Sequence, residues 1–231
     1  MLTLDDLVLR QGDFTLRADF ALKDGVRAAV LGPSGGGKST LLGAIAGFVA
    51  PRQGRILWDG TDLGPLAPGQ RPLSILFQEN NLFPHLTVTQ NVGLGLHPDL
   101  KLSANDHQRV LDALTRVGLA DLRERKPAAL SGGQQGRVAL ARVLLRARPL
   151  LLLDEPFSAL GPALKREMLA LVSEVAQETG ATVMMVSHDP QDAQHFAGQT
   201  ILVNDGLALP PRDTAALFAN PPAGLQAYLG H

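Results

Sequence analysis

The stretch from Gly32 to Thr40 constrains this chain more than any other. It reads Gly-Pro-Ser-Gly-Gly-Gly-Lys-Ser-Thr and matches the phosphate-binding motif G-x-x-x-x-G-K-[ST] at every fixed position. Glycines let consecutive backbone N–H groups turn toward an anion with no Cβ in the way. An apolar strand is expected at residues 26–31 and a helix at 39–47, whose N-terminus would face the same anion. The sequence therefore predicts a nucleoside-triphosphate site.

The residue types within this loop indicate separate roles. Lys38 is expected to neutralise the β- and γ-phosphates, and the Ser39 hydroxyl to ligate Mg²⁺. The alternative is a glycine-rich turn with a surface lysine, which the flanking strand and helix disfavour. The predicted nucleotide-binding residues are Gly32, Pro33, Ser34, Gly35, Gly36, Gly37, Lys38, Ser39 and Thr40.

Composition excludes several other classes of protein. With 45% hydrophobic and 19% charged residues in 231, a folded globular chain is expected rather than a disordered one. The formal net charge of −1 gives no electrostatic reason to expect nucleic acid as a partner. Without cysteine, disulfides, thiolate catalysis and cysteine-ligated zinc are excluded. No stretch approaches ~20 uninterrupted apolar residues, so the chain is not expected to span a membrane by itself.

The alternation of strand and helix patterns predicts an α/β fold with a mostly parallel sheet covered by helices on both faces. Residues 1–25 alternate polar and apolar, which indicates an antiparallel β part with a turn at Gly12 and Asp13. Further strands are expected at 55–60, 73–77, 150–153, 182–186 and 201–203, and helices at 103–118, 131–148 and 162–179. We predict a single domain over residues 1–231, with an α/β core (1–79 and 149–231) and a helical subdomain (80–148).

Two carboxylates follow the all-leucine strand candidate at residues 150–153. Asp154, at the carboxyl end of a buried strand beside the phosphate loop, can hold Mg²⁺ through its water shell. Glu155 can polarise the attacking water as a general base. The alternative is a pair of acids on a surface loop.

A second glycine-rich stretch, Leu130-Ser131-Gly132-Gly133-Gln134, opens the helix expected at 131–148. Ser131 and Gln134 form a capping box, so a purely structural interpretation is available. Two consecutive glycines in a first helical turn cost up to ~1 kcal/mol each. They indicate that this backbone approaches something closely, such as a second phosphate.

These motifs together resemble the nucleotide-binding domain of an ABC transporter over nearly the whole chain, with Leu-Ser-Gly-Gly-Gln as the family-specific stretch. The resemblance implies that Gln78 contacts Mg²⁺ and the attacking water, and that His188 contacts the γ-phosphate. A lone glutamine or histidine after a strand would otherwise be interpreted as a solvated or structural residue. The residues implied to bind ATP in trans are Ser131, Gly132, Gly133 and Gln134.

The resemblance also implies partners and a location. ATP and Mg²⁺ would be sandwiched in a head-to-tail dimer with a second copy of the chain. This dimer would drive transmembrane permease subunits and, through them, serve a periplasmic binding protein. The chain would lie peripherally at the cytoplasmic face of the bacterial inner membrane.

Residues 77–88 and 91–96 resemble importer ATPases, most closely the ATP-binding subunits of bacterial thiamine importers. The implied solute is thiamine or its phosphates, with iron, polyamine, sulfate or molybdate as alternatives. A non-transport phosphate-loop ATPase or a small-molecule kinase is the remaining alternative. Leu82, Phe83 and Leu86 are either ordinary core residues or part of a groove for the membrane subunit.

The chain departs from the family pattern at two functional positions. Gly161 stands where the family usually has aspartate, which puts coordination between the two sites of a dimer in question. Near position 11 the family tends to carry an aromatic residue that stacks on adenine. Here Gln11 stands at that point, and Phe14 is the nearest aromatic candidate.

Overall fold

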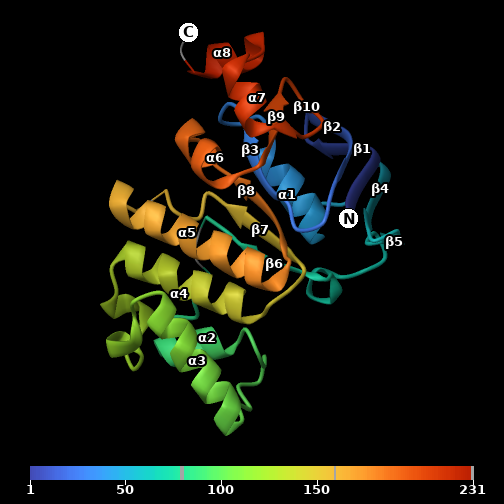
Figure 1. The fold of residues 1–231 in the computed structure, drawn as a ribbon. Helices are drawn as coiled ribbons and strands as arrows, with labels where there is room; N and C mark the ends of the chain where they lie inside the picture. The colour runs from blue at the N-terminus through green and yellow to red at the C-terminus, as the bar shows by residue number, and fades with distance from the viewer. Residues whose placement is uncertain (79–80, 159, 230–231) are drawn as a thin grey trace.

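A computed structural model describes residues 1–78, 81–158 and 160–229 (Figure 1). Its sheet runs in the order β5-β4-β1-β2-β10-β9-β3-β8-β7-β6, and β11 pairs with β9. The strands that pair in parallel register around the centre are β3 (Arg27–Leu31), β6 (Leu73–Leu76), β7 (Leu150–Asp154), β8 (Thr182–Val186) and β9 (Gln199–Asn204). The predicted α/β class with a mostly parallel core is confirmed.

The central strands are buried on both faces, which explains their apolar sequences. Every residue of β7 and β8 is buried, as expected for parallel strands covered by helices on both sides. Register then fixes where these strands end. Val186 of β8 lies opposite both Val30 of β3 and Asp154 of β7, so the loops after all three strands leave the sheet at one edge.

The N-terminal part is antiparallel, as the alternating sequence predicts. Strand β1 (Leu2–Gln11) pairs with β2 (Phe14–Leu22) across the turn at Gly12 and Asp13, and with β4 (Gln53–Trp58) on its other side. The short strands β5 (Thr61–Asp62), β10 (Leu207–Ala208) and β11 (Arg212–Asp213) complete the sheet.

The helices are α1 (Lys38–Ala46), α2 (Val88–Gly93), α3 (Ala104–Arg116), α4 (Gly132–Leu145), α5 (Pro162–Thr179), α6 (Pro190–Phe196), α7 (Thr214–Ala219) and α8 (Ala223–Leu229). Helix α1 shares one apolar core with the antiparallel strands, whereas α3, α4 and α5 share another on the opposite face of the parallel strands. Figure 1 shows α2, α3 and α4 grouped at one end of the molecule and α8 at the other.

The predicted subdomain division stays a prediction. Helices α2, α3 and α4 pack against one another and fall within the range 80–148, but the boundary at Glu79 and Asn80 lies outside the described residues. The apolar side chains of α3 and α4 are continuous with those of α5 in one core. In the described residues, no helix combines the length and the apolar character that crossing a bilayer requires.

The close approach of β4 to β1 gives a stability prediction. Gly54 has φ +80°, and a Cβ at this position would lie 2.2 Å from the carbonyl oxygen of Asp6. Gly54→Ala is therefore expected to lower the free energy of unfolding by about 2 kcal/mol or more, from left-handed strain and backbone displacement. Gly69→Ala is the control, because nothing lies within 4 Å of its added Cβ. Urea unfolding of both variants tests this, and equal midpoints would contradict it.

Candidate nucleotide-binding site

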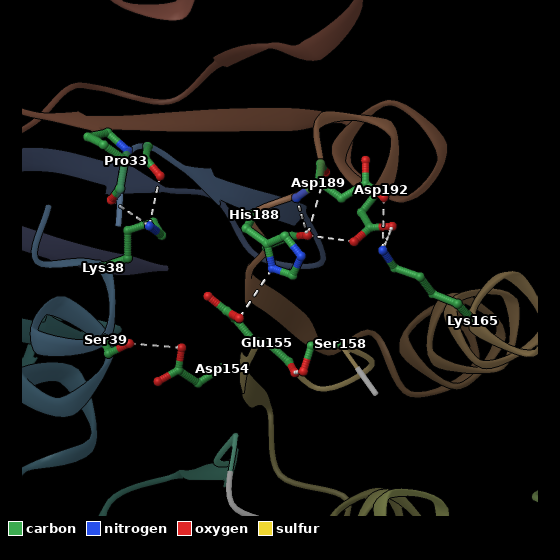
Figure 2. A network of polar contacts seen from close by, with 12 residues as sticks. Pro33, Lys38, Ser39, Asp154, Glu155, Ser158, Lys165, His188, Asp189 and Asp192 are labelled. Atoms are coloured by element: carbon green, nitrogen blue, oxygen red, sulfur yellow. Dashed lines mark hydrogen bonds and ion pairs between the residues drawn. The ribbon is translucent and has the colours of Figure 1, made fainter. Parts of the chain in front are cut away.

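Three loops meet at the carboxyl edge of the parallel strands (Figure 2). The phosphate loop connects β3 to α1, Glu155 follows β7, and His188 follows β8. The matching register of these strands brings residues that are more than a hundred positions apart into one polar cluster. Sequence reasoning named the members of this cluster, and the structure brings the phosphate loop, both carboxylates and the histidine together.

Lys38 is the first residue of α1 and is held inside the phosphate loop. Its side-chain Nζ donates hydrogen bonds to the carbonyl oxygens of Gly32 and Pro33, each at 2.8 Å, and the residue is only 7% exposed. Burial lowers the pKa of Lys38, while the carboxylates of Glu155 and Asp154 counteract this effect. A cation held in this way beside free helix N–H groups suits a polyphosphate.

The side-chain oxygen atoms of Ser39 and Asp154 lie close together. The Ser39 hydroxyl donates to Asp154 Oδ1 at 3.1 Å. Burial raises the pKa of Asp154 above its ordinary value, against the hydrogen bond from Ser39. Among the described residues, no group of three or more metal-binding side chains forms a complete site. The pair of oxygen donors, the Ser39 hydroxyl and the Asp154 carboxylate, fits Mg²⁺, which takes few protein ligands and completes its shell with water and phosphate oxygens.

Glu155 occupies a backbone conformation that is rare for a residue with a side chain. Its φ is +46°, and such strain persists where the surrounding structure imposes it, often at functional sites. Its backbone N–H donates to the carbonyl of Val186 at 3.1 Å. Its side-chain Oε2 lies 3.2 Å from Nδ1 of His188. The acid and the histidine named from the sequence are therefore direct neighbours.

The glycine-rich stretch at the start of α4 has the capping box that the sequence predicts. The Ser131 hydroxyl accepts from the Gln134 backbone at 3.3 Å, and the Gln134 side chain accepts from the Ser131 backbone at 2.9 Å. A Cβ at Gly132 would meet nothing within 4 Å, whereas one at Gly133 would lie 2.8 Å from Leu160 Cδ2. Within one chain, no hydrogen bond among the described residues joins this stretch to the phosphate loop.

The remaining predicted positions are arranged less tightly. Gln78 follows β6 and is exposed, and no side-chain hydrogen bond in the described part of the chain joins it to Asp154. Gly161 caps α5 without a side-chain bond, and a Cβ there would meet no atom within 4 Å. The ring of Phe14 lies against Gly37 of the phosphate loop, since an added Cβ at that glycine would come within 2.7 Å of it.

Comparison with known proteins gives the family. The sequence model of the ABC transporter family matches residues 16–158 of this chain. The chain belongs to the ABC transporter family. The thiamine import ATP-binding proteins ThiQ of Cereibacter sphaeroides and Ruegeria sp. are 70% and 57% identical to it over 230 residues, covering 100% of each chain. A solved dimeric ATP-binding cassette, MJ0796, bound to ADP and Pi has a TM-score of 0.83 at 30% identity, covering 93% of this chain and 99% of its own.

This ABC transporter chain also contains an ion-pair cluster that sequence reasoning missed. Lys165, in the first turns of α5, lies 2.7 Å from Asp192 and 3.0 Å from Asp189. Burial disfavours the charged lysine, but the bonds to both carboxylates outweigh it and raise the pKa of Lys165. Asp192 also accepts a hydrogen bond from the Ser187 hydroxyl. The cluster ties α5 to the loop that carries His188 (Figure 2).

The Lys165 cluster gives a pH-dependent prediction. Lys165→Met leaves two carboxylates without their cation, and we expect the free energy of unfolding to fall by about 1–3 kcal/mol at neutral pH. Burial alone would raise the pKa of Asp189, but the hydrogen bond from Lys165 brings this pKa below its ordinary value. The stabilisation is therefore present above the unfolded aspartate pKa of about 4 and is lost as pH falls through the lower folded value.

Urea unfolding of Lys165→Met at pH 7 and at pH 3 measures this difference. The control is Lys23→Met, because Lys23 is exposed and should have little effect at either pH. A loss of stability that is equally large at both pH values would show that the lysine acts by packing alone.

Proposed function

We propose that this chain is the ATP-hydrolysing subunit of an importer of thiamine or its phosphates. The observation that supports the solute is full-length identity of 70% to a protein named for thiamine import. The resemblance of residues 77–88 and 91–96 to thiamine importers supports the same conclusion. An importer ATPase for another small solute is the alternative within the same family.

In the proposed site, the phosphate loop from Gly32 to Thr40 binds the phosphates of ATP, and Lys38 neutralises their charge. Ser39 and Asp154 would hold Mg²⁺, with Gln78 as a further ligand. When bound, Mg²⁺ supplies charge neutralisation for the leaving phosphate. Burial raises the pKa of Asp154. A bound cation would lower this pKa, because positive charge favours the carboxylate form.

Hydrolysis is assigned to Glu155 and His188. Glu155 orients and deprotonates the attacking water, and its strained backbone (φ +46°) aims the side chain toward the histidine. His188 contacts the γ-phosphate, and its 3.2 Å contact with Glu155 links the two groups. The charge interaction of Glu155 with Lys38 of the phosphate loop and the position of His188 beside Glu155 support these roles.

A second copy of the chain completes the site in trans through Ser131, Gly132, Gly133 and Gln134. The N-terminus of α4, where Gly132 and Gly133 leave the backbone uncovered by side chains, suits a phosphate. A Cβ at Gly132 would meet no atom within 4 Å, so contacts within one chain do not explain why glycine stands at this position. The dimeric cassettes with TM-scores of 0.83 and 0.82 support such an assembly.

The permease subunits are proposed to dock in a groove of about 350 Å³ between α1 and α4. Its lining includes Phe48 and Phe83, which are 58% and 47% exposed, and large exposed aromatic side chains are typical of interfaces. Leu82, by contrast, packs against the core. With the permease docked in this groove, we propose that the chain lies peripherally on the cytoplasmic face of the inner membrane and that a periplasmic binding protein serves the other side of the permease.

Lys38→Ala tests the site and the solute together. We expect ATP turnover by the purified chain to fall at least a hundredfold, because the buried cation of the phosphate site is lost. Uptake of labelled thiamine by cells that carry this variant should also be lost, while Lys23→Ala leaves both unchanged. Retained ATP turnover would overturn the nucleotide site. Lost turnover with normal thiamine uptake would keep the ATPase and exclude thiamine.

Glu155→Gln separates an ABC ATPase from a small-molecule kinase. An ATPase that needs this carboxylate as its base should lose turnover at least a hundredfold, keep ATP affinity within about twofold and accumulate as an ATP-bound dimer. Size-exclusion chromatography with and without Mg²⁺ and ATP measures this. A variant that binds ATP and stays monomeric would contradict the composite site.

A further inference from the structure

The C-terminal helix α8 lies against the loops of the nucleotide site. Its Leu225 is 1% exposed and belongs to the main apolar core. Leu225 and Tyr228 line a cavity of about 140 Å³ together with Gly32 and Pro33, the first two residues of the phosphate loop. Helix α8 is therefore anchored beside this loop rather than extending away from it.

The hydroxyl of Tyr228 donates a hydrogen bond to the backbone carbonyl of His188 at 2.5 Å. The ring Nδ1 of the same histidine lies 3.2 Å from Glu155 Oε2. The next residue, Asp189, is held by Lys165 at 3.0 Å. The short segment that carries His188 is thus fixed by a neutral donor from α8 and by an ion pair from α5.

We propose that Tyr228 is a positioning residue for ATP hydrolysis, which fixes the backbone of His188 so that its ring stays aligned with Glu155. The inference rests on the proposed function, because it needs His188 to act on the nucleotide. Tyr228 does not touch the reacting atoms, and its effect passes through the carbonyl of His188.

The chemistry of the phenol supports this role. Burial, followed by the charges of Asp189 and Glu155, raises the pKa of Tyr228 above its ordinary value. The hydroxyl is therefore protonated at neutral pH and can donate. Tyr228 is the only tyrosine of the chain, so no second phenol can replace it.

Tyr228→Phe removes the donor and keeps the ring. The loss of one hydrogen bond that orients a reacting group is expected to lower kcat about three- to tenfold, with KM for ATP within about twofold of the wild-type value. Gln226→Ala is the matched control. Gln226 is on the same helix and donates to the carbonyl of Pro221 at 2.8 Å, without contact to His188, so its kcat should not change.

A spectroscopic measurement separates positioning from general destabilisation. Ring signals of the six histidines can be recorded by NMR, and His188→Ala identifies the signal of His188. Tyr228→Phe should shift that signal and leave those of His97 and His107 in place, with an unfolding midpoint equal to that of Gln226→Ala.

The proposal is overturned if Tyr228→Phe keeps wild-type kcat, if it lowers kcat without moving the His188 signal, or if Gln226→Ala lowers kcat equally. Lys38→Ala separates a failure of the proposed role of Tyr228 from a failure of the proposed function. If Lys38→Ala abolishes turnover and Tyr228→Phe does not affect it, only the role of Tyr228 is wrong. If Lys38→Ala retains turnover, the proposed function itself is wrong.

Discussion

The parallel pairing of β3, β8 and β7 is the constraint on which the rest of this structure depends. Because Val186 is level with both Val30 and Asp154, the loops after three strands emerge at one edge of the sheet. Ligands of open α/β sheets bind at this edge. The apolar sequences of these strands determine their burial, and their register then brings the phosphate loop, the two carboxylates and His188 together.

Burying charged side chains at one edge of the sheet costs free energy, and local hydrogen bonds offset part of this cost. Lys38 and Asp154 are 7% and 8% exposed. Burial lowers the pKa of Lys38 and raises that of Asp154, which favours the neutral form of each. Hydrogen bonds from Lys38 to two carbonyls and from Ser39 to Asp154 reduce this cost. Bound ligands of opposite charge would further stabilise both charged side chains, as expected of a site that holds a nucleotide and a cation.

Local patterns predicted the regular elements well, and contacts between distant side chains were not predictable in this way. The helix at 162–179 and the strand at 182–186 were confirmed with the same limits, because Pro162 and Gly180 mark the helix ends and the strand is uniformly apolar. Helix α6 was not predicted, since a seven-residue helix gives too little periodicity. Neither the Lys165 cluster nor the Tyr228 contact has a motif, because each depends on how α5 and α8 pack against the loop after β8.

In the proposed mechanism, ATP binds between the phosphate loop of one chain and the Ser131–Gln134 stretch of a second copy. The chain has no cysteine, so Ser34→Cys and Ser131→Cys can be introduced together into the Glu155→Gln chain and treated with a short bis-maleimide. We expect a covalent dimer on a denaturing gel when Mg²⁺ and ATP are present, and far less of it with ADP. A chain that binds ATP and gives no ATP-dependent covalent dimer would contradict it.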